Sequence, residues 1–226
     1  MRGPDVGTPW RQANWHFLEK HISRLDPEAI ILDVGAGRGD FASIFKLHHY
    51  ISLDVYPYPE VDIVCDLTVI NPFREASLDA IVLTNVLEHI YHTQTMLNTL
   101  AKLLKVGGVL LVSVPFLLKV HQAPYDFVRY THYSLQRLGD EIGLAIEILE
   151  GYYDPIFLLG EGTNNIKWWV LPTLSKGRRL LSRVLLSGLQ ILSLLMERII
   201  GKGYVIHPSK SLSPAPIGYQ IVYRKP

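Results

Sequence analysis

The sequence predicts an α/β fold in which a seven-stranded, mostly parallel sheet has helices on both faces and a last strand that runs antiparallel. Three observations predict it. Runs rich in Val, Ile and Leu alternate with amphipathic helical segments, a glycine-rich turn follows the first run, and the C-terminal residues alternate between apolar and polar positions. Parallel strands buried on both faces have this near-continuous apolar character.

The strands are expected in a regular order along the chain. Those of the parallel part are expected at 29–35, 49–55, 61–67, 78–86, 109–116 and 145–153, and the antiparallel one at 217–225. Ligands bind such sheets at the carboxyl ends of the strands, so the residues that follow each strand are the candidates for function.

The helical segments have clear start and stop signals. Residues 9–25 predict a helix that Asp26-Pro27 ends, and 41–47 predict a short one. The segment 92–108, HTQTMLNTLAKLLKVGG, predicts an amphipathic helix stopped by its two glycines. Residues 133–144 predict another helix, which ends at Gly143.

Two domain boundaries follow from this order of elements. Residues 1–27 are expected to form an N-terminal helical cap, and residues 28–226 one domain. That domain is expected to carry a helical insertion at about 155–212, between the sixth strand and the last.

Composition and charge exclude several classes of protein. Apolar residues make up 48% of the chain and the net charge is +1, so a core can form and no nucleic-acid partner is expected. Cys65 is the single cysteine, which rules out an intramolecular disulfide and favours a reducing compartment. The N-terminal residues lack the apolar stretch of a signal peptide, and a cytoplasmic location is expected.

The first strand ends in Asp33-Val34-Gly35-Ala36-Gly37-Arg38-Gly39. Glycines here permit a positive φ and let a ligand lie against the main chain. The spacing is G-x-G-x-G, whereas the dinucleotide fingerprint is G-x-G-x-x-G, so a nicotinamide cofactor is disfavoured. The carboxylate of Asp33 would repel a pyrophosphate but suits a ligand that carries an amine or a sulfonium. Without a ligand, the loop would be an ordinary strand-to-helix turn.

Two further acids end the next strands. Asp54 ends the second strand, 21 residues after Asp33, where an acid can accept both hydroxyl hydrogens of a ribose. Asp66 ends the third strand, where it or the amide of Leu67 is placed to meet the edge of an adenine.

Six stretches, in this order, resemble the class I S-adenosylmethionine-dependent methyltransferases, in particular small-molecule enzymes of the methyltransferase type 11 kind. They are LDVGAGRG, SLDV, VCDL, LDAIVLTNVLEHI, LKVGGVLLVSVP and RYTHYSLQRLGDEIGL, and they cover roughly residues 28–152. The resemblance implies a Rossmann-like sheet and S-adenosyl-L-methionine as cofactor. It implies that Gly35, Gly37 and Gly39 line the amino-acid end of the cofactor, Asp54 holds the ribose, Asp66 lies near the adenine and Asn85 lies beneath the methionine moiety.

Polar and aromatic residues gather after the fifth strand, in PFLLKVHQAPYDFVRYTHYS. His121 is the first candidate for a general base, because the ordinary pKa of histidine lies near neutrality. The candidates for contact with the acceptor are Tyr125, Asp126, Arg129 and Tyr130. Alternatively, the tyrosines pack on the sheet and Asp126 pairs with Arg129 for structure. The stretch resembles the P-Y-D-F-x-R-Y-T segment of methyltransferases of sugar and surface-glycan pathways.

His89, in VLEHI, is a second and weaker candidate base, with helix capping or packing as the alternative. Its neighbour Glu88 is expected to be a solvated acid of a first helical turn. No set of metal ligands is predicted.

The leading hypothesis is an enzyme that methylates a small molecule or a glycan at oxygen, by direct displacement aided by a base. The family that the sequence resembles also methylates carbon and nitrogen. The alternative is a catalytically inactive cofactor-binding or regulatory protein with the same fold.

The segment 180–200 predicts an amphipathic helix in a basic part of the insertion. Residues 161–212 carry eight Lys or Arg and two Glu, a net charge of +6. Its charged residues argue against a transmembrane helix. Three roles stay open: a cover over the sheet, a lid or dimer interface, or contact with an anionic membrane surface, where the acceptor could be a lipid-linked glycan.

Overall fold

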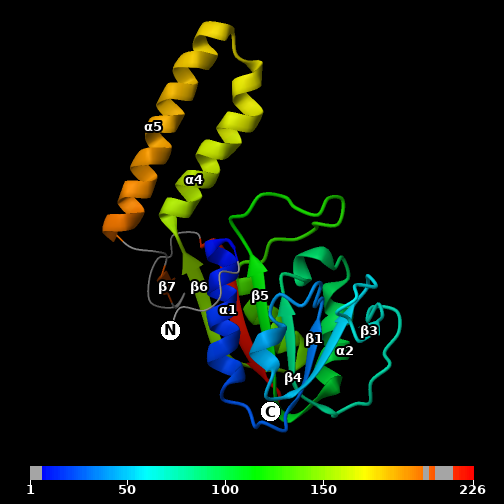
Figure 1. The fold of residues 1–226 in the computed structure, drawn as a ribbon. Helices are drawn as coiled ribbons and strands as arrows, with labels where there is room; N and C mark the ends of the chain where they lie inside the picture. The colour runs from blue at the N-terminus through cyan, green and yellow to red at the C-terminus, as the bar shows by residue number, and fades with distance from the viewer. Residues whose placement is uncertain (1–6, 201–203, 207–215) are drawn as a thin grey trace.

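The computed structural model describes residues 7–200, 204–206 and 216–226, and at its centre lies an eight-stranded sheet (Figure 1). Its strands lie in the order β3-β2-β1-β4-β5-β8-β6-β7. Their bounds are β1 Ile30–Val34, β2 His49–Asp54, β3 Ile63–Val64, β4 Leu78–Thr84, β5 Leu104–Pro115, β6 Ala145–Tyr153, β7 Tyr204–Ile206 and β8 Gly218–Arg224. The mostly parallel sheet with an antiparallel last strand is confirmed, and the short strand β7 is an addition at its edge.

The strand directions decide where the functional edge lies. β1 pairs in parallel with β2 and β4, and β4 pairs in parallel with β5. β8 runs antiparallel to both β5 and β6, so β6 points the same way as the first five strands. The carboxyl ends of all these parallel strands therefore share one edge of the sheet.

Both faces of the sheet are buried under helices, which are α1 Pro9–Ile22, α2 Thr93–Leu103 and α3 His132–Ile142. Adjacent residues of β1 show this arrangement. Ile31 packs in a core with Phe17 of α1, whereas Leu32 packs in a second core with Leu97 of α2 and Leu135 of α3. Successive apolar residues in one strand need a cover on each face, which explains the continuous apolar run in the sequence.

Caps set the ends of two helices. The side chain of Thr8 accepts a hydrogen bond from the backbone N–H of Arg11 at the start of α1, and Thr131 accepts one from Ser134 at the start of α3. Gly143 adopts a left-handed conformation, with φ 70°, and ends α3 as predicted.

The helix before β5 ends earlier than predicted. α2 ends at Leu103, and Leu104 already pairs with Leu78 of β4, so Gly107 and Gly108 lie within β5 and cap no helix. The predicted glycine stop is wrong because strand pairing takes over directly after the helix. The short helix expected over 41–47 is a single 3-10 turn, Ala42–Phe45.

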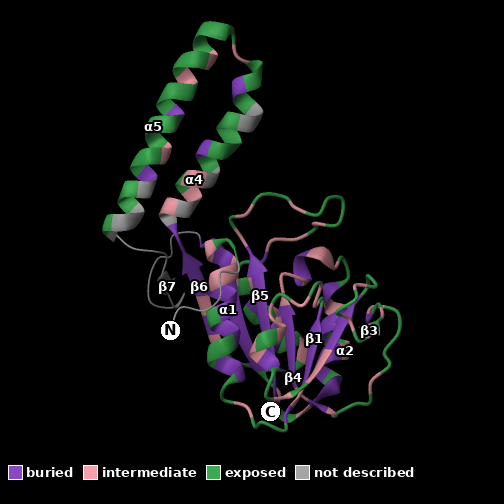
Figure 2. Ribbon diagram, in the orientation of Figure 1, coloured by how far each residue is buried: buried purple, intermediate pink, exposed green. Residues whose placement is uncertain are grey.

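The insertion forms a helical hairpin that stands away from the sheet (Figure 1). α4 Pro155–Asn165 leads through a π-helical turn, Ile166–Val170, and a 3-10 turn, Leu171–Thr173, into α5 Lys176–Ile200. Most of the hairpin surface is exposed (Figure 2). α5 does not cover the sheet, and no helix in the described part of the chain is long and apolar enough to cross a membrane. The expected insertion also includes 201–203 and 207–212, which lie outside the described residues.

Candidate functional site

The glycine loop leaves the carboxyl end of β1 with a backbone that favours glycine. Gly35, Gly37 and Gly39 all have positive φ, at 74°, 56° and 70°. A Cβ on Gly35 would lie 2.4 Å from Cγ2 of Val86, so this glycine is needed for packing. A Cβ on Gly37 would have no heavy atom within 4 Å, so the space over this part of the loop is open.

Asp54, at the end of β2, holds the glycine loop from one side. One oxygen of its carboxylate accepts a 2.9 Å hydrogen bond from the backbone N–H of Gly37, and the other accepts one of 2.9 Å from Tyr56. The residue is 8% exposed. The carboxylate is therefore fixed in orientation beside the open side of the loop, and its remaining lone pairs are free to accept hydroxyl hydrogens.

Asp33 lies at the same edge but is more deeply buried, at 5% exposed. Its carboxylate accepts a 2.9 Å hydrogen bond from the Tyr50 hydroxyl. Burial raises the pKa of Asp33 to about 7, and the nearby charge of Asp54 acts in the same direction.

Three other residues, Asp66, Leu67 and Asn85, were predicted to contact the cofactor. Asp66 is exposed, and one of its oxygens accepts hydrogen bonds from the backbone N–H and the hydroxyl of Thr68. Leu67 is buried, with its side chain in the core. Asn85, directly after β4, has φ 55° and its side-chain oxygen accepts a 2.8 Å hydrogen bond from the indole N–H of Trp10 in α1.

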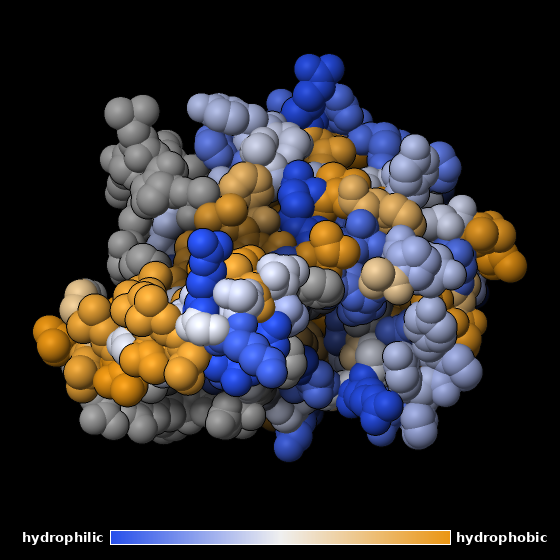
Figure 3. All heavy atoms as spheres, turned by 90° about the horizontal axis from the view of Figure 1, so that it is seen from above, coloured by the Kyte–Doolittle hydropathy of each residue, from blue (hydrophilic) through white to orange (hydrophobic). Residues whose placement is uncertain are grey.

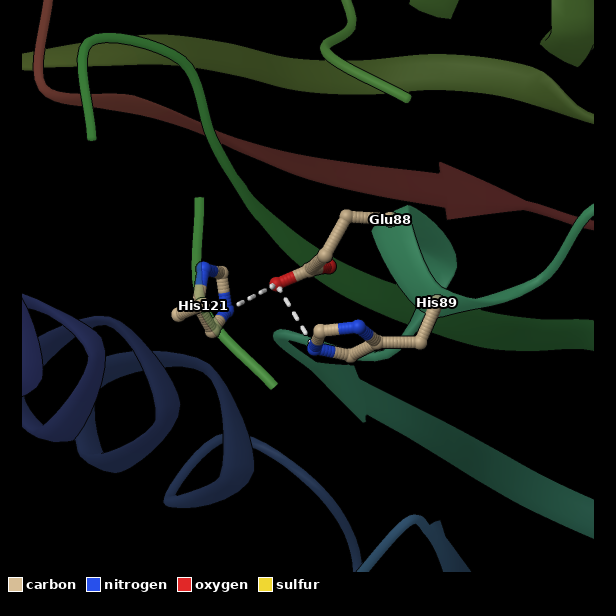
Figure 4. Close-up of side chains that lie close together, drawn as sticks. All are labelled: Glu88, His89 and His121. Carbon is tan, nitrogen blue, oxygen red and sulfur yellow. Dashed lines mark ion pairs between the residues drawn. The ribbon is translucent and has the colours of Figure 1, made fainter. Parts of the chain in front are cut away.

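Beside this edge, Glu88, His89 and His121 form a compact cluster, which we call the Glu-His cluster (Figure 4). Glu88 and His89 lie in a 3-10 turn after β4, and His121 lies in the loop after β5. The two loops meet because the backbone N–H of Phe127 donates to the carbonyl of Glu88 over 2.8 Å. The cluster thus joins the two strand ends next to the glycine loop.

Glu88 is 0% exposed and its carboxylate lies between the two histidines. Its Oε1 is 3.7 Å from Nε2 of His89 and 3.6 Å from Nε2 of His121. The expectation of a solvated Glu88 is therefore wrong, because the loop after β5 covers it. Facing this carboxylate raises the pKa of His121 above its ordinary value, and the charge of Asp126 adds to the effect.

The opposite ring nitrogen of each histidine faces an acceptor. Nδ1 of His89 lies 2.6 Å from the carbonyl oxygen of Tyr125. Nδ1 of His121 lies 3.2 Å from Oδ2 of Asp126 and 3.3 Å from the carbonyl oxygen of Lys119. The two rings meet edge to face at 4.9 Å. One ligand atom from each of the three cluster residues lies within 4.8 Å of the others, so this set could hold a metal ion.

The four residues predicted to contact the acceptor do not all lie together. Asp126 and Arg129 form an ion pair with a 2.7 Å hydrogen bond, and the Asp126 side chain is 1% exposed, so this pair supports the loop. The Arg129 guanidinium lowers the pKa of Asp126 well below its usual range. Tyr130 is not brought to the cluster, because its ring is buried and its hydroxyl bonds to Thr93 and to the Leu87 carbonyl. Tyr125 is exposed beside the cluster.

The geometry fits the cofactor that the sequence resemblance implied. An open glycine loop with the fixed carboxylate of Asp54 beside it offers backbone space and acceptors for a ribose, and the carboxyl group of Asp33 lies buried at the same edge. Sequence reasoning missed the part played by Glu88 and the bond from Trp10 to Asn85. The apolar residues on both sides of Glu88-His89 were the one local sign that these two side chains face inward.

Solved structures share this fold. An S-adenosylmethionine-dependent methyltransferase from Archaeoglobus fulgidus superposes with a TM-score of 0.59 at 15% identity, over 97% of this chain and 95% of that one. The 1,6-didemethyltoxoflavin N1-methyltransferase of Burkholderia thailandensis was crystallised with 1,6-didemethyltoxoflavin and S-adenosylhomocysteine. It superposes with a TM-score of 0.53 at 22% identity, over 63% of this chain and 70% of that one. The cyclase SpnF gives 0.58 at 15% identity, over 98% and 85%. Identities this low show the fold alone. No curated protein matches the chain significantly.

The sheet order and the glycine loop define the class I S-adenosylmethionine-dependent methyltransferase fold. The chain belongs to the family described as "Methyltransferase domain", which it matches over residues 10–146, more than half of its 226 residues. It is therefore an S-adenosylmethionine-dependent methyltransferase. The family match favours an enzyme over an inactive protein with the same fold.

Proposed function

We propose that the protein transfers a methyl group from S-adenosylmethionine to a hydroxyl group of a small molecule or a glycan. The observation that carries this proposal is that the glycine loop with Asp54 and the Glu-His cluster lie at the same carboxyl edge of the sheet. A cofactor site and a polar acceptor site at one edge suit a direct transfer, which requires the two reactants to be aligned.

The residues that hold the cofactor follow from the loop geometry. Gly35, Gly37 and Gly39 line its amino-acid end, Asp54 accepts the ribose hydroxyls and Asp33 faces its positive charge. When bound, S-adenosylmethionine supplies a methyl group on a sulfonium sulfur, and displacement by the acceptor oxygen forms a C–O bond as the C–S bond breaks.

The remaining predicted cofactor residues have supporting parts in this proposal. The segment of Asp66 and Leu67 borders the adenine end through its backbone, since Thr68 already occupies one carboxylate oxygen of Asp66. Asn85 fixes the floor of the site through its bond to Trp10.

The acceptor is held between the Glu-His cluster and exposed aromatic rings. Tyr125 is 58% exposed and Phe127 44% exposed, and Phe127 packs edge to face against Tyr91 at 5.7 Å. Aromatic surface beside a few fixed polar groups suits an amphiphilic ligand such as a sugar ring. This supports the resemblance of the 124–131 stretch to methyltransferases of sugar and surface-glycan pathways.

Calorimetric titration with S-adenosylmethionine and S-adenosylhomocysteine tests the cofactor site. We expect both compounds to bind, and Asp54→Ala to weaken binding at least tenfold, since one charged hydrogen-bond acceptor contributes about 1.5–3 kcal/mol. Glu141→Ala is the matched control, because Glu141 pairs with Arg137 on the surface of α3. No binding of either compound would overturn the proposal.

A panel of hydroxyl acceptors tests the reaction. Radiolabelled methyl transfer to free sugars, nucleotide sugars, lipid-linked glycans and phenols is measured, followed by mass spectrometry of the product. Transfer to nitrogen or carbon alone would show that the assignment to oxygen is wrong and leave the cofactor site standing.

A further inference from the structure

The contact geometry of the Glu-His cluster leaves polar atoms without partners. The distances of 3.6 Å and 3.7 Å from the two Nε2 atoms to Oε1 of Glu88 are too long for hydrogen bonds. Within the described part of the chain, both carboxylate oxygens of Glu88 and Nε2 of His89 are buried and without a hydrogen-bond partner. A buried carboxylate without any partner is costly, so something of positive charge is needed there.

The protonation of the two imidazole rings indicates which positive group this is. A carbonyl oxygen only accepts, so Nδ1 of His89 carries the proton that it donates to Tyr125, and its Nε2 keeps a lone pair. Nδ1 of His121 faces the Asp126 carboxylate and the Lys119 carbonyl, which are also acceptors. With both Nδ1 atoms protonated, two lone pairs and a carboxylate face one another, and this repulsion is removed either by a second proton on His121 or by a metal ion between the three groups.

The distances from Glu88 to the two histidines match those between ligands of one ion. Bonds of about 2.0–2.2 Å to a zinc-type ion place neighbouring ligand atoms about 3.4–3.6 Å apart at tetrahedral to trigonal angles. The two separations from Oε1 of Glu88, 3.6 Å and 3.7 Å, agree with this, and all three ligand atoms lie within 4.8 Å of one another. A histidine that donates from its second nitrogen to a carboxylate or a carbonyl is the usual support for a metal ligand.

We propose that Glu88, His89 and His121 bind one divalent transition-metal ion through Oε1 and the two Nε2 atoms. Two imidazoles and one carboxylate are a common set in catalytic zinc and non-haem iron sites, which keep positions open for water or substrate. Asp126 and the Tyr125 carbonyl orient the two rings. The side chain of His121 is 31% exposed, so the open positions face the acceptor side. In this site His121 is a ligand and not a free base.

This deepens the proposed function, because such an ion lowers the pKa of an acceptor hydroxyl that it binds. Only that role rests on the proposed function. Binding of the ion depends on the cluster alone, so it is measured without acceptor or cofactor.

The test is titration of tag-free, chelator-treated protein with Co²⁺, followed by visible absorption, and with Zn²⁺ in competition. We expect one ion per chain, and at least tenfold weaker binding in His89→Gln and His121→Gln. His92→Gln is the matched control, since His92 is exposed, outside the cluster and three residues from His89. Glu88→Gln removes the third ligand and should weaken binding as well. If this variant of a fully buried residue does not fold, His121→Gln still tests the site, because the His121 side chain is 31% exposed.

Absence of bound ion, or binding that both histidine variants leave unchanged, would overturn the metal site. A parallel titration with S-adenosylmethionine separates the two proposals. Cofactor binding without metal removes only the metal site, and metal binding without cofactor removes only the proposed function.

The hairpin of α4 and α5 carries a second, independent inference. Its inner contacts are partly polar: Leu186 and Ser193 of α5 are buried, and Gln190 between them donates a 3.0 Å hydrogen bond to Asn164 of α4. These positions are spaced i, i+4, i+7 and form one stripe of α5. The apolar side of the helix therefore faces outward.

The outward side is a broad apolar surface. Leu181, Leu185, Leu192, Leu195 and Ile199 lie on one stripe of α5 and are 48–79% exposed. Seen from above, hydrophobic side chains gather at the left of the view, on the side where the hairpin stands (Figure 3). A contiguous exposed apolar face marks an interaction surface.

Charge identifies what covers this face. Residues 155–200 carry six Lys or Arg and two Glu, a net charge of +4. Two such hairpins packed together would bring like charges close, whereas an anionic lipid surface attracts them. Within the described residues no helix can cross a membrane, and a basic amphipathic helix with a wide apolar face lies in the plane of the interface.

We infer that the apolar face of α5 inserts into the surface of an anionic lipid bilayer. The hairpin follows β6 and so leaves the sheet from its carboxyl edge, the edge of the glycine loop and the Glu-His cluster. Bilayer contact therefore lies on the active side of the protein, where an acceptor with a lipid tail would be presented.

Co-sedimentation of the full chain with vesicles tests this, with phosphatidylcholine alone or with one third phosphatidylglycerol. We expect binding to the anionic vesicles that weakens with salt, and at least a tenfold loss in Leu185→Glu. Ser175→Glu is the control, because it adds the same charge at an exposed position directly before α5. The cofactor affinity of both variants should equal that of the wild type.

Two results would overturn the lipid contact. One is no binding to either vesicle, and the other is a loss as large in Ser175→Glu as in Leu185→Glu. A dimer in sedimentation velocity that Leu185→Glu dissociates, without vesicle binding, would assign the face to a second copy of the chain.

Discussion

The carboxylate of Asp54 accepts a 2.9 Å hydrogen bond from the backbone N–H of Gly37, so the end of β2 holds the loop that follows β1. Asp54 therefore has two tasks, because the same group that is proposed to grip the ribose also sets the shape of the glycine loop.

The first prediction separates these tasks in Asp54→Asn. The amide keeps the shape of the side chain, but its NH₂ group has to face either the Gly37 or the Tyr56 backbone N–H. We expect the free energy of unfolding to fall by about 1–3 kcal/mol in urea without cofactor. We also expect the stabilisation by added S-adenosylhomocysteine to shrink. Unfolding equal to the wild type would mean that the bond does not hold the loop.

The second prediction concerns Gly35 and Gly37, whose substitutions should fail for different reasons. Gly35→Ala places a Cβ 2.4 Å from Val86, so we expect a loss of fold stability of about 1–3 kcal/mol from overpacking, with further strain from the positive φ. Gly37→Ala meets no neighbour, so only the backbone strain remains, about 1 kcal/mol. Its main effect should be on cofactor affinity.

Thermal unfolding and cofactor titration of the two variants, measured side by side, check this. Gly177→Ala serves as the control, since a Cβ there also meets no neighbour and its φ is not positive. If Gly37→Ala binds the cofactor as the wild type does, the open space over the loop is not the cofactor site.

The loop and Asp54 could be predicted from the sequence because the features that reveal them are local. Glycines spaced by single residues directly after an apolar strand, and an acid that ends the next strand, need no knowledge of distant contacts. The same holds for α3, which begins at a capping Thr131 and ends at Gly143.

The Glu-His cluster could not be predicted in this way. His121 meets Glu88 through a loop without periodicity, and Glu88 is buried only because the chain near Phe127 folds over it. The orientation of the hairpin could not be predicted for a related reason. Amphipathicity predicted the helix over 180–200, but the polar bond from Gln190 to Asn164 decides that the apolar side faces outward.

The third prediction is a pH dependence caused by Asp33. Burial raises its pKa in the folded state to about 7, while the unfolded chain has the ordinary value near 4, so the unfolded state ionises first as the pH rises. Stability that the neutral form provides below pH 4 is then lost progressively up to pH 7. Asp33→Asn cannot ionise, so its stability relative to the wild type should rise by roughly 1–3 kcal/mol between pH 5 and pH 7.

Urea unfolding of both proteins at a series of pH values measures this difference, in which all other titrating groups cancel. Asp140→Asn, which removes an exposed acid of α3, is the control for the loss of one carboxyl group. A flat difference for Asp33→Asn between pH 5 and pH 7 would mean that Asp33 is ionised throughout this range in the folded protein.

The last prediction concerns the bond between Trp10 and Asn85, which ties α1 to the loop after β4. Trp10 and Trp15 are matched for a comparison, since both lie in α1 and are 3% and 5% exposed. The indole N–H of Trp10 donates to Asn85 over 2.8 Å, whereas that of Trp15 has no partner among the described residues. Trp→Phe removes similar volume at both sites, but only Trp10→Phe leaves a partly buried acceptor, the side-chain oxygen of Asn85, without its partner. We expect Trp10→Phe to lower the free energy of unfolding by about 1–2 kcal/mol more than Trp15→Phe does. The excess should vanish in the Asn85→Ala background, and equal losses at the two sites would show that packing alone fixes α1 over the active edge.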